Sequence, residues 1–265
     1  MSRKEADMTG SDSLQDHDSI IVLSPHLDDA ALSCGSLIAR AAISQPVTVM
    51  TLFTSSTAGR VSLSARAFLR QCNARSASLL FEQRRAEDRV ALRSIGVTGV
   101  HLGLADALFR QREKSRLLRI ASRLVPELSC VYPTFRRHID AGRVSPHDRP
   151  LLDALEKRIL LASGKGDLVL APLGLGGHVD HVFTHELGAR LSRHRSIGWY
   201  ADQPYVLRAG APGEAPTNTE RVVHEVDRGV KTELISWYGT QVTALFGTET
   251  VPHLEEYVYL PRAAA

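Results

Sequence analysis

Apolar runs of strand length alternate with longer segments of helical period along most of the chain. The predicted strands are residues 19–24, 46–53, 99–104, 128–133, 167–173, 197–202 and 256–260. The predicted amphipathic helices are residues 29–43, 79–95, 111–124, 149–163 and 180–193. Continuous apolar strands that alternate with helices indicate βαβ units, in which helices bury both faces of a parallel sheet. We therefore predict a Rossmann-like α/β fold with a mostly parallel sheet, helices on both faces and a single domain.

Polar segments mark the ends and the long connections of this domain. Residues 1–17 are polar and are expected to be a disordered lead, followed by one folded domain over residues 18–265. Long loops are expected at residues 54–78, 134–148 and 203–224. In open α/β sheets ligands bind at the carboxyl ends of the strands, so these loops are expected to overhang a binding site.

Composition narrows the class of protein. The chain has 265 residues and a net charge of +3, and its basic residues are interleaved with acidic ones, which does not favour nucleic acid as a partner. No segment offers the roughly 18 consecutive apolar residues of a membrane span, and the polar start does not resemble a signal peptide. The three cysteines are far apart and support neither a disulfide framework nor a thiolate metal site. We expect a cytoplasmic enzyme that acts on a small molecule.

The first chemical motif, "PHLDD", directly follows the first predicted strand. His26, Asp28 and Asp29 stand where nucleotide-binding folds carry a glycine-rich turn, and the first glycine here is Gly35. An imidazole and two carboxylates are ligands for a divalent cation. One aspartate alone could simply cap the following helix, but a cap explains neither the histidine nor the second carboxylate.

The second motif, "HVDH", follows the strand at 167–173 and opens another helix. His178 and His181 are three residues apart, so both can face one space. His185 could instead pair with His181, although a single helix histidine is more often structural. Two adjacent strand ends that present His, Asp and His would form a three-ligand site with an open fourth position, which is typical of catalytic zinc.

These residue types permit metal-assisted hydrolysis of an amide. Zinc with three protein ligands lowers the pKa of a bound water to about 7 and polarises a carbonyl oxygen. Two consecutive aspartates suit this chemistry, because one can bind the metal while the other accepts a proton. A further histidine can stabilise the oxyanion or protonate the leaving amine.

"PHLDD" together with "HVDH" resembles the PIG-L, or LmbE-like, family of zinc-dependent N-acetylglucosaminyl deacetylases. The segments "RRAEDRVALRSIGV" (84–97), "HLGLADA" (101–107) and "WYADQPY" (199–205) are also similar to patterns of this family. The resemblance extends over most of the chain and implies a zinc-dependent enzyme that removes an N-acetyl or other N-acyl group. Its expected substrate is an N-acetylglucosamine conjugate in natural-product or glycoconjugate biosynthesis.

The resemblance also implies a role for each matching residue. It assigns one Zn²⁺ per chain to the ligands His26, Asp29 and His181. It makes Asp28 the general base and His178 the group that polarises the carbonyl or protonates the amine.

The resemblance further assigns Arg84 and Asp106 to substrate binding. The alternative readings are an exposed helix arginine paired with Glu87 or Asp88, and an aspartate that starts a turn. The chain departs from the family pattern at Ala30, where many members carry a glutamate that would tune the metal.

Three other interpretations compete with this one. The "GLGGHV" segment contains the G-x-G of a dinucleotide site, but Val179 replaces the third glycine. A phosphatase with an aspartate nucleophile would need that aspartate at the strand end, where this chain has Pro25 and His26. A non-catalytic sugar-binding protein on the same fold would not need Asp28.

Trp199, Tyr200 and Tyr205 could stack on a sugar, although strand aromatics usually serve the core.

Overall fold

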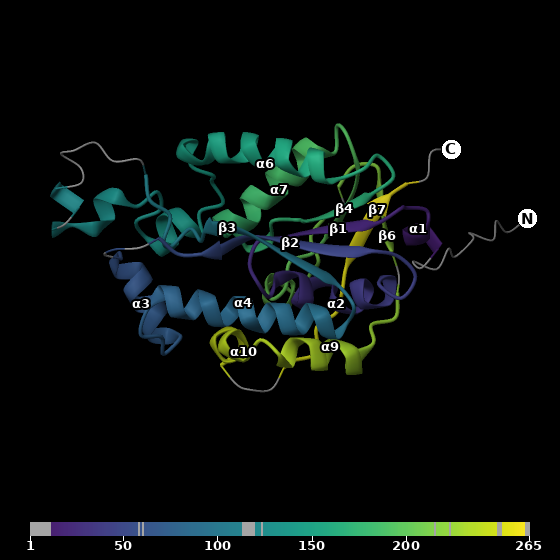
Figure 1. Cartoon of the computed structure of the whole chain (residues 1–265), viewed down its shortest axis with the longest axis horizontal. Helices are drawn as coiled ribbons and strands as arrows, with labels where there is room; N and C mark the ends of the chain where they lie inside the picture. The colour runs from purple at the N-terminus through teal and green to yellow at the C-terminus, as the bar shows by residue number, and fades with distance from the viewer. Residues whose placement is uncertain are drawn as a thin grey trace, which may run out of the picture.

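The computed structural model describes residues 12–57, 59, 61–112, 120–122, 124–214, 216–222, 224–247 and 251–262. Within these residues one sheet of seven strands runs through the middle of the molecule (Figure 1), in the order β3-β2-β1-β4-β5-β7-β6. The strands are β1 (Ile20–Ser24), β2 (Val47–Ser55), β3 (Thr98–Ala105), β4 (Leu168–Pro172), β5 (Ser196–Tyr200), β6 (Thr219–Val222) and β7 (Val258–Pro261).

The sheet is mostly parallel, which confirms the predicted fold class. The pairs β1/β2, β1/β4, β2/β3 and β4/β5 are parallel, and only β7 runs antiparallel to its neighbours β5 and β6. From β1 the chain moves outward to β2 and β3 and then returns to place β4 on the other side of β1. The carboxyl ends of β1 and β4 therefore form the topological switch point, where open α/β sheets bind ligands.

Helices cover both faces of the sheet (Figure 1). One face carries α2 (Asp29–Ala41), α4 (Ala77–Ser94), α9 (Arg228–Ser236) and α10 (Gly239–Phe246), and the other carries α6 (Arg149–Ala162) and α7 (Val179–Leu191). Shorter helices are α1 (Asp12–Gln15), α3 (Leu63–Gln71), α8 (Tyr205–Ala209), η1 (Pro126–Ser129), η2 (Phe135–Ile139), η3 (Pro146–Asp148) and η4 (Leu175–Gly177). None of the described helices combines the length and the apolar composition that crossing a bilayer requires.

The core has two layers because successive side chains of a strand point to opposite faces. Ile20 and Val22 of β1 pack in one cluster with apolar side chains of α2. Ile21 and Leu23 pack in another cluster with α6 and α7. Since β1 is buried on both faces, it is a continuous apolar run in the sequence, as expected for a central parallel strand.

The strand predicted at 128–133 is wrong. Residues 126–129 form the 3₁₀ turn η1, and the only ladder contact described there is an isolated bridge between Gln111 and Cys130. Val131 and Tyr132 are buried in a loop cluster with Phe109, so the apolar run reflects burial and not strand pairing. Prolines bound this run on both sides and cannot donate to a ladder.

All three predicted loops also contain short regular elements. Residues 54–78 include α3, which Ser62 caps by accepting a hydrogen bond from the backbone N–H of Ala65. Residues 203–224 include α8 and β6, and residues 134–148 form only the short helices η2 and η3. Helices α9 and α10 were not predicted. Of the helix predicted at 111–124, residues 113–119 and 123 lie outside the described part of the chain, as do residues 1–11 of the expected lead.

A buried ionic cluster supports the middle of α2. The helix is interrupted at Cys34 (φ −145°, ψ 25°), so new backbone N–H groups become free at Ser36 and Leu37. The carboxylate of Glu256 accepts hydrogen bonds from both, at 2.8 and 3.0 Å. The ammonium group of Lys231 lies 2.7 Å from the same carboxylate and is also buried. Glu256 therefore connects the β7 end of the chain to α2, the helix that Asp29 begins.

We expect Glu256→Gln to lower the free energy of unfolding by roughly 3–5 kcal/mol at neutral pH, because Lys231 is then buried without its anion. Burial favours the neutral form of Glu256, but Lys231 and the hydrogen bond with His224 hold its pKa below the ordinary value. The stabilisation is therefore fully present above the pKa of the unfolded chain and is lost as the pH falls through the lower folded pKa. Urea unfolding of the wild type and the variant from pH 7 to pH 3 measures both effects.

The matched control is Glu255→Gln, because that neighbouring carboxylate is exposed. It should change the free energy of unfolding by no more than about 0.5 kcal/mol. Equal stability of the wild type and Glu256→Gln at pH 7 would contradict the role given to this cluster.

Candidate metal centre and active site

The two predicted motifs meet at the switch point of the sheet. His26, Asp28 and Asp29 follow β1, and His178 and His181 begin α7 after β4. The imidazole centroids of His26 and His181 are 5.3 Å apart, although about 150 residues separate them in the chain. Adjacent parallel strands bring the two segments together because their carboxyl ends lie at the same edge of the sheet.

The turn between β1 and α2 holds its polar side chains through short local hydrogen bonds. Ser24 Oγ donates to the carbonyl of His26 at 2.6 Å and accepts from the backbone N–H of Ala30 at 3.2 Å. Asp29 Oδ2 accepts from the backbone N–H of His26 at 2.8 Å. Asp28 is the N-cap residue of α2, but its side chain makes no capping hydrogen bond. A capping role therefore does not account for the Asp28 carboxylate.

His26, Asp29 and His181 form a group that fits one divalent cation. Their ligand atoms all lie within 4.8 Å of one another. Asp29 Oδ2 is 3.1 Å from His26 Nδ1 and 3.3 Å from His181 Nε2. Bonds of about 2.0–2.1 Å in a tetrahedral zinc site separate neighbouring ligand atoms by roughly 3.3 Å. These two distances match that requirement, and two imidazoles with one carboxylate are a zinc donor set.

A second group of His26, His178 and Asp180 is also compact enough to hold a metal. The oxygens of Asp180 already have partners, however. Oδ1 pairs with Arg110 at 2.5 Å, and Oδ2 accepts from the backbone N–H of Ala107 at 2.9 Å. Oδ2 also lies 3.3 Å from His26 Nε2. These contacts favour Asp180 as a group that orients His26, and they leave the group containing Asp29 as the better cation site.

The electrostatics of the site favour a positive charge between its carboxylates. Burial alone would lower the pKa of His26, but Asp180 and Asp29 raise it well above the ordinary value. The pKa of His181 is also raised, since Asp29 and Asp202 outweigh its burial. A cavity that stabilises extra protons on two imidazoles will also stabilise a metal cation in their place.

Asp28 has the protonation behaviour of a general base. Burial and the neighbouring charge of Asp29 raise its pKa to about 6, while Arg84 and His26 oppose that rise. A carboxyl group whose pKa lies near the working pH transfers protons efficiently.

His178 is neutral and presents an N–H group. Its Nδ1 accepts a hydrogen bond from the backbone N–H of Asp180 at 3.3 Å, which leaves the proton on Nε2. Burial, followed by the charge of His26, lowers the pKa of His178 to about 3. The ring lies edge-on to His26, with centroids 5.1 Å apart. His178 is therefore a hydrogen-bond donor beside the candidate metal ligands.

The site opens into a cavity of about 460 Å³. All seven residues singled out by the sequence line it: His26, Asp28, Asp29, Arg84, Asp106, His178 and His181. The apolar part of the wall includes Leu32, Phe68, Leu108, Phe135, Ala244 and Leu245. The metal motifs thus form one polar wall of a pocket to which α3, α8, α10 and η2 also contribute.

Arg84 is buried, so its reading as an exposed arginine paired with Glu87 or Asp88 is wrong. Glu87 instead accepts hydrogen bonds from Thr240 at the start of α10, and Asp88 bonds to other residues. The Arg84 guanidinium lies 5.4 Å from the ring centroid of Phe68. Its buried Nε has no hydrogen-bond partner within the described part of the chain. A ligand oxygen would satisfy that donor.

Asp106 lies at the site, whereas the strand aromatics Trp199 and Tyr200 belong to the core. Asp106 Oδ1 accepts from the backbone N–H of Leu108, as a turn aspartate does, while Oδ2 lies 3.7 Å from His26 Nε2. Trp199 and Tyr200 belong to the core clusters, as strand aromatics usually do. His185 packs against Trp199, with ring centroids 4.7 Å apart, and belongs to neither candidate metal group among the described residues.

Two buried residues of the site were missed in the sequence. Asp202 follows β5 and pairs with His181, and Arg110 follows β3 and pairs with both Asp180 and Asp148. A carboxylate at the last position of the strand predicted at 197–202 was a usable signal for Asp202. Arg110 carried no comparable signal, because its partners follow β4 and precede α6.

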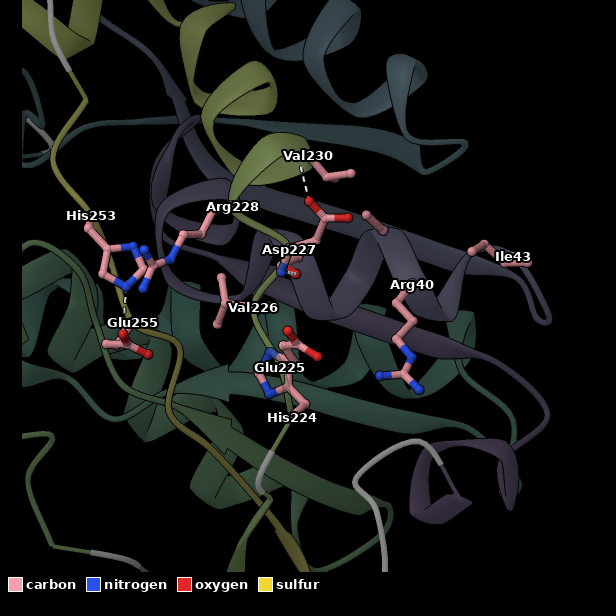
Figure 2. Close-up of a pocket in the computed structure, with 12 residues that line it drawn as sticks. Arg40, Ile43, His224, Glu225, Val226, Asp227, Arg228, Val230, His253 and Glu255 are labelled. Carbon is pink, nitrogen blue, oxygen red and sulfur yellow. Dashed lines mark hydrogen bonds and ion pairs between the residues drawn. The ribbon is translucent and has the colours of Figure 1, made fainter.

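A wider cavity of about 870 Å³ lies beside α2 and the segment before α9 (Figure 2). Arg40 of α2 and Ile43, which follows that helix, face it from one side, and an ion pair between His253 and Glu255 lies at another edge. No residue of the candidate site lines this cavity. The chemistry indicated by the sequence therefore belongs to the smaller cavity at the switch point.

Fold and site together define an α/β protein with a candidate metal centre at the switch point of its sheet. The chain belongs to the PIG-L family, because the model of that family, described as GlcNAc-PI de-N-acetylase, matches residues 21–192. The matched segment begins within β1 and ends just beyond α7, so it includes both metal motifs.

Known proteins similar to this chain include 2'-N-acetylparomamine deacetylase of Streptomyces fradiae. The identity is 30% over 167 residues, or 62% of this chain and 49% of that protein. The chain thus spans about half the length of this relative.

Three solved structures share the fold at 24% identity. One is a deacetylase in complex with teicoplanin, from the biosynthesis pathway of teicoplanin (TM-score 0.68, covering 92% of this chain and 97% of that one). Another is the A40926 pseudoaglycone deacetylase (TM-score 0.65, covering 93% and 97%). A third, a zinc-inhibited form of a teicoplanin deacetylase, has a TM-score of 0.68 and covers 87% of each chain.

One aromatic contact beside the metal motifs depends on a glycine. Tyr205 lies edge-on to His181, with ring centroids 5.2 Å apart, and its ring packs on Gly176 in η4. Gly176 has φ +76°, and a Cβ there would lie 2.0 Å from Tyr205 Cδ1. Only glycine combines this backbone conformation with such close contact.

We expect Gly176→Ala to destabilise the fold by roughly 1–3 kcal/mol more than Gly210→Ala, because of this overlap. Gly210 is the matched control: it has φ +70°, and no heavy atom would lie within 4 Å of its added Cβ. Both variants therefore share the backbone strain, and only the first displaces Tyr205. Urea unfolding measures the difference, and equal destabilisation would contradict the packing of Tyr205 on η4.

Proposed function

We propose that the protein is a zinc-dependent hydrolase that removes an N-acetyl or other N-acyl group from an N-acetylglucosamine-containing conjugate. The observation that carries this proposal is the meeting of His26, Asp29 and His181 around one point, with the uncapped carboxylate of Asp28 beside them. Membership of the PIG-L family supports it. The activities named for the S. fradiae relative and the teicoplanin deacetylases are of the same kind.

Each polar side chain of the site has a separate role in the proposed reaction. His26, Asp29 and His181 would hold one Zn²⁺, which supplies Lewis acidity to a water molecule and to the amide carbonyl. Asp28 takes the proton from the attacking water, for which its pKa of about 6 is suited. His178 donates a hydrogen bond from Nε2 to the carbonyl oxygen as negative charge develops there. Asp28, which then carries the proton taken from the water, returns it to the departing amine, so His178 remains a neutral donor throughout.

Substrate binding is assigned to the remaining polar groups of the cavity. Arg84, whose Nε has no partner in the described part of the chain, and Asp106 would bind hydroxyl groups of the sugar. The apolar wall formed by Phe68, Phe135 and Leu245 would receive the rest of the conjugate. We place this reaction in natural-product or glycoconjugate biosynthesis, as the names of the relatives suggest, and in the cytoplasm.

Zinc loading together with acetate release tests the proposal. Apoprotein prepared by chelation should be inactive and should regain activity with one equivalent of zinc per chain. Zinc should be titrated and not supplied in excess, because one structural neighbour was captured in a zinc-inhibited form. The substrates are an N-acetylglucosaminyl glycoside, an N-acetylparomamine and an N-acetylglucosaminyl glycopeptide. Activity that persists in the chelated protein would contradict the metal mechanism.

We expect Asp28→Asn to retain one zinc per chain and to lower kcat by roughly 10²-fold or more, because the general base is lost while the ligands remain. Metal analysis and initial rates of acetate release measure the two properties separately. Asp153→Asn is the control, since that carboxylate is exposed on α6. Loss of zinc from Asp28→Asn would show that Asp28 is a metal ligand and not only the general base. A wild type that binds zinc and sugar conjugates without releasing acetate would favour the non-catalytic alternative.

A further inference from the structure

Asp202 is a fully buried carboxylate that lies outside the two metal motifs, "PHLDD" and "HVDH". It follows β5, the strand next to β4, and its exposed fraction is 0%. Oδ1 lies 2.6 Å from Nδ1 of His181, and Oδ2 accepts a hydrogen bond from the backbone N–H of Leu175 at 3.1 Å. Leu175 begins η4, the turn that leads into His178. One carboxylate therefore contacts both the candidate ligand His181 and the segment before His178.

The contact with Asp202 determines which nitrogen of His181 keeps a lone pair that can bind a metal. An ionised carboxylate only accepts hydrogen bonds, so the imidazole must carry its proton on Nδ1. Nε2 then keeps its lone pair, and it is Nε2 that lies 3.3 Å from Asp29 Oδ2 in the candidate metal group. A histidine that binds a metal through one nitrogen commonly donates from the other to a carboxylate, which fixes the ring and increases its basicity.

We infer that Asp202 is a positioning residue for the metal: it holds His181 in the Nδ1–H tautomer and directs Nε2 to the cation. This inference rests on the proposed function, because it concerns the same metal. It adds a residue that follows a third strand, β5, to a site whose two metal motifs follow β1 and β4.

A carboxylate is required here because both of its neighbours are donors. The Nδ1–H of His181 points at one oxygen and the N–H of Leu175 at the other. An asparagine offers one acceptor and one donor group. If its NH₂ faced His181, the imidazole would have to accept at Nδ1 and carry its proton on Nε2, where the metal binds. If its NH₂ instead faced Leu175, two buried donors would oppose each other.

Zinc affinity measured without substrate tests the inference. Chelator competition should give a dissociation constant for Asp202→Asn that is roughly 10–100-fold higher than that of the wild type. Thermal unfolding in zinc-free buffer checks that the variant folds. Equal zinc affinity in the folded variant and the wild type would overturn the inference. A wild type that binds no zinc would refute the proposed function itself, so the two failures are distinguishable.

Asp88→Asn is the matched control. Asp88 is buried and lies 2.7 Å from Nε2 of His101, so it forms an aspartate–histidine pair of the same kind. His101 belongs to neither candidate metal group among the described residues. The control should therefore keep the wild-type zinc affinity, and a loss as large as that of Asp202→Asn would assign the effect to general destabilisation.

A second measurement uses the wild type alone and tests the tautomer of His181 even if Asp202→Asn does not fold. Long-range ¹H–¹⁵N NMR spectra of the zinc-loaded wild type report which nitrogen of each imidazole carries a proton. We expect a slowly exchanging proton on Nδ1 of His181 and none on its Nε2. A zinc-loaded protein whose His181 is unprotonated at Nδ1 would overturn the inference.

Discussion

Two imidazoles and a carboxylate can share one cation only if β1 and β4 lie side by side with their carboxyl ends at the same edge of the sheet. The register that pairs Val22 with Leu170 supplies this arrangement. His26 lies in the short turn after β1, and Asp29 begins α2 at the end of that turn. His181 lies in the first turn of α7, the helix that follows β4. Much of the remaining architecture buries this strand pair: α2 covers one face and α7 the other.

Bringing buried carboxylates together carries a desolvation cost that the surrounding groups offset. Asp180 is paired with Arg110, whose guanidinium also lies 2.5 Å from Asp148. Asp202 accepts from His181 and Leu175. The site is therefore held in place by hydrogen bonds before any ligand arrives, which is how a metal centre is preorganised. Arg84 differs, because its buried Nε has no hydrogen-bond partner among the described residues, and we propose that a substrate oxygen accepts from it.

The sequence was sufficient for the elements that carry the chemistry. Strands β1 and β4 are continuous apolar runs. "PHLDD" directly follows β1, and "HVDH" follows β4 after the short turn η4, so the strand pattern and the motifs agree. The antiparallel edge was harder to find. The four residues of β6 were hidden in a predicted loop, and residues 128–133 resembled a strand because burial in a loop produces the same apolar run. Helices α9 and α10 are short, and both were missed.

The side chains around the motifs could not be predicted because they depend on which strands become neighbours. A single aspartate after a strand is common, and Asp202 acquires its role only because β5 pairs with β4. Arg110 reaches Asp180 across 70 residues of sequence, and no local pattern reveals that contact. Arg84 could be read either as an exposed or as a binding residue until the packing of α4 against the cavity was known.

The central claim is that one cation lies between the two motifs, and anomalous diffraction at the zinc edge tests it most directly. Crystals grown with one equivalent of zinc should give a single strong peak about 2.0–2.2 Å from His26 Nδ1, Asp29 Oδ2 and His181 Nε2. A peak between His178 and Asp180 instead, or the absence of any peak at the switch point in zinc-loaded crystals, would contradict the account.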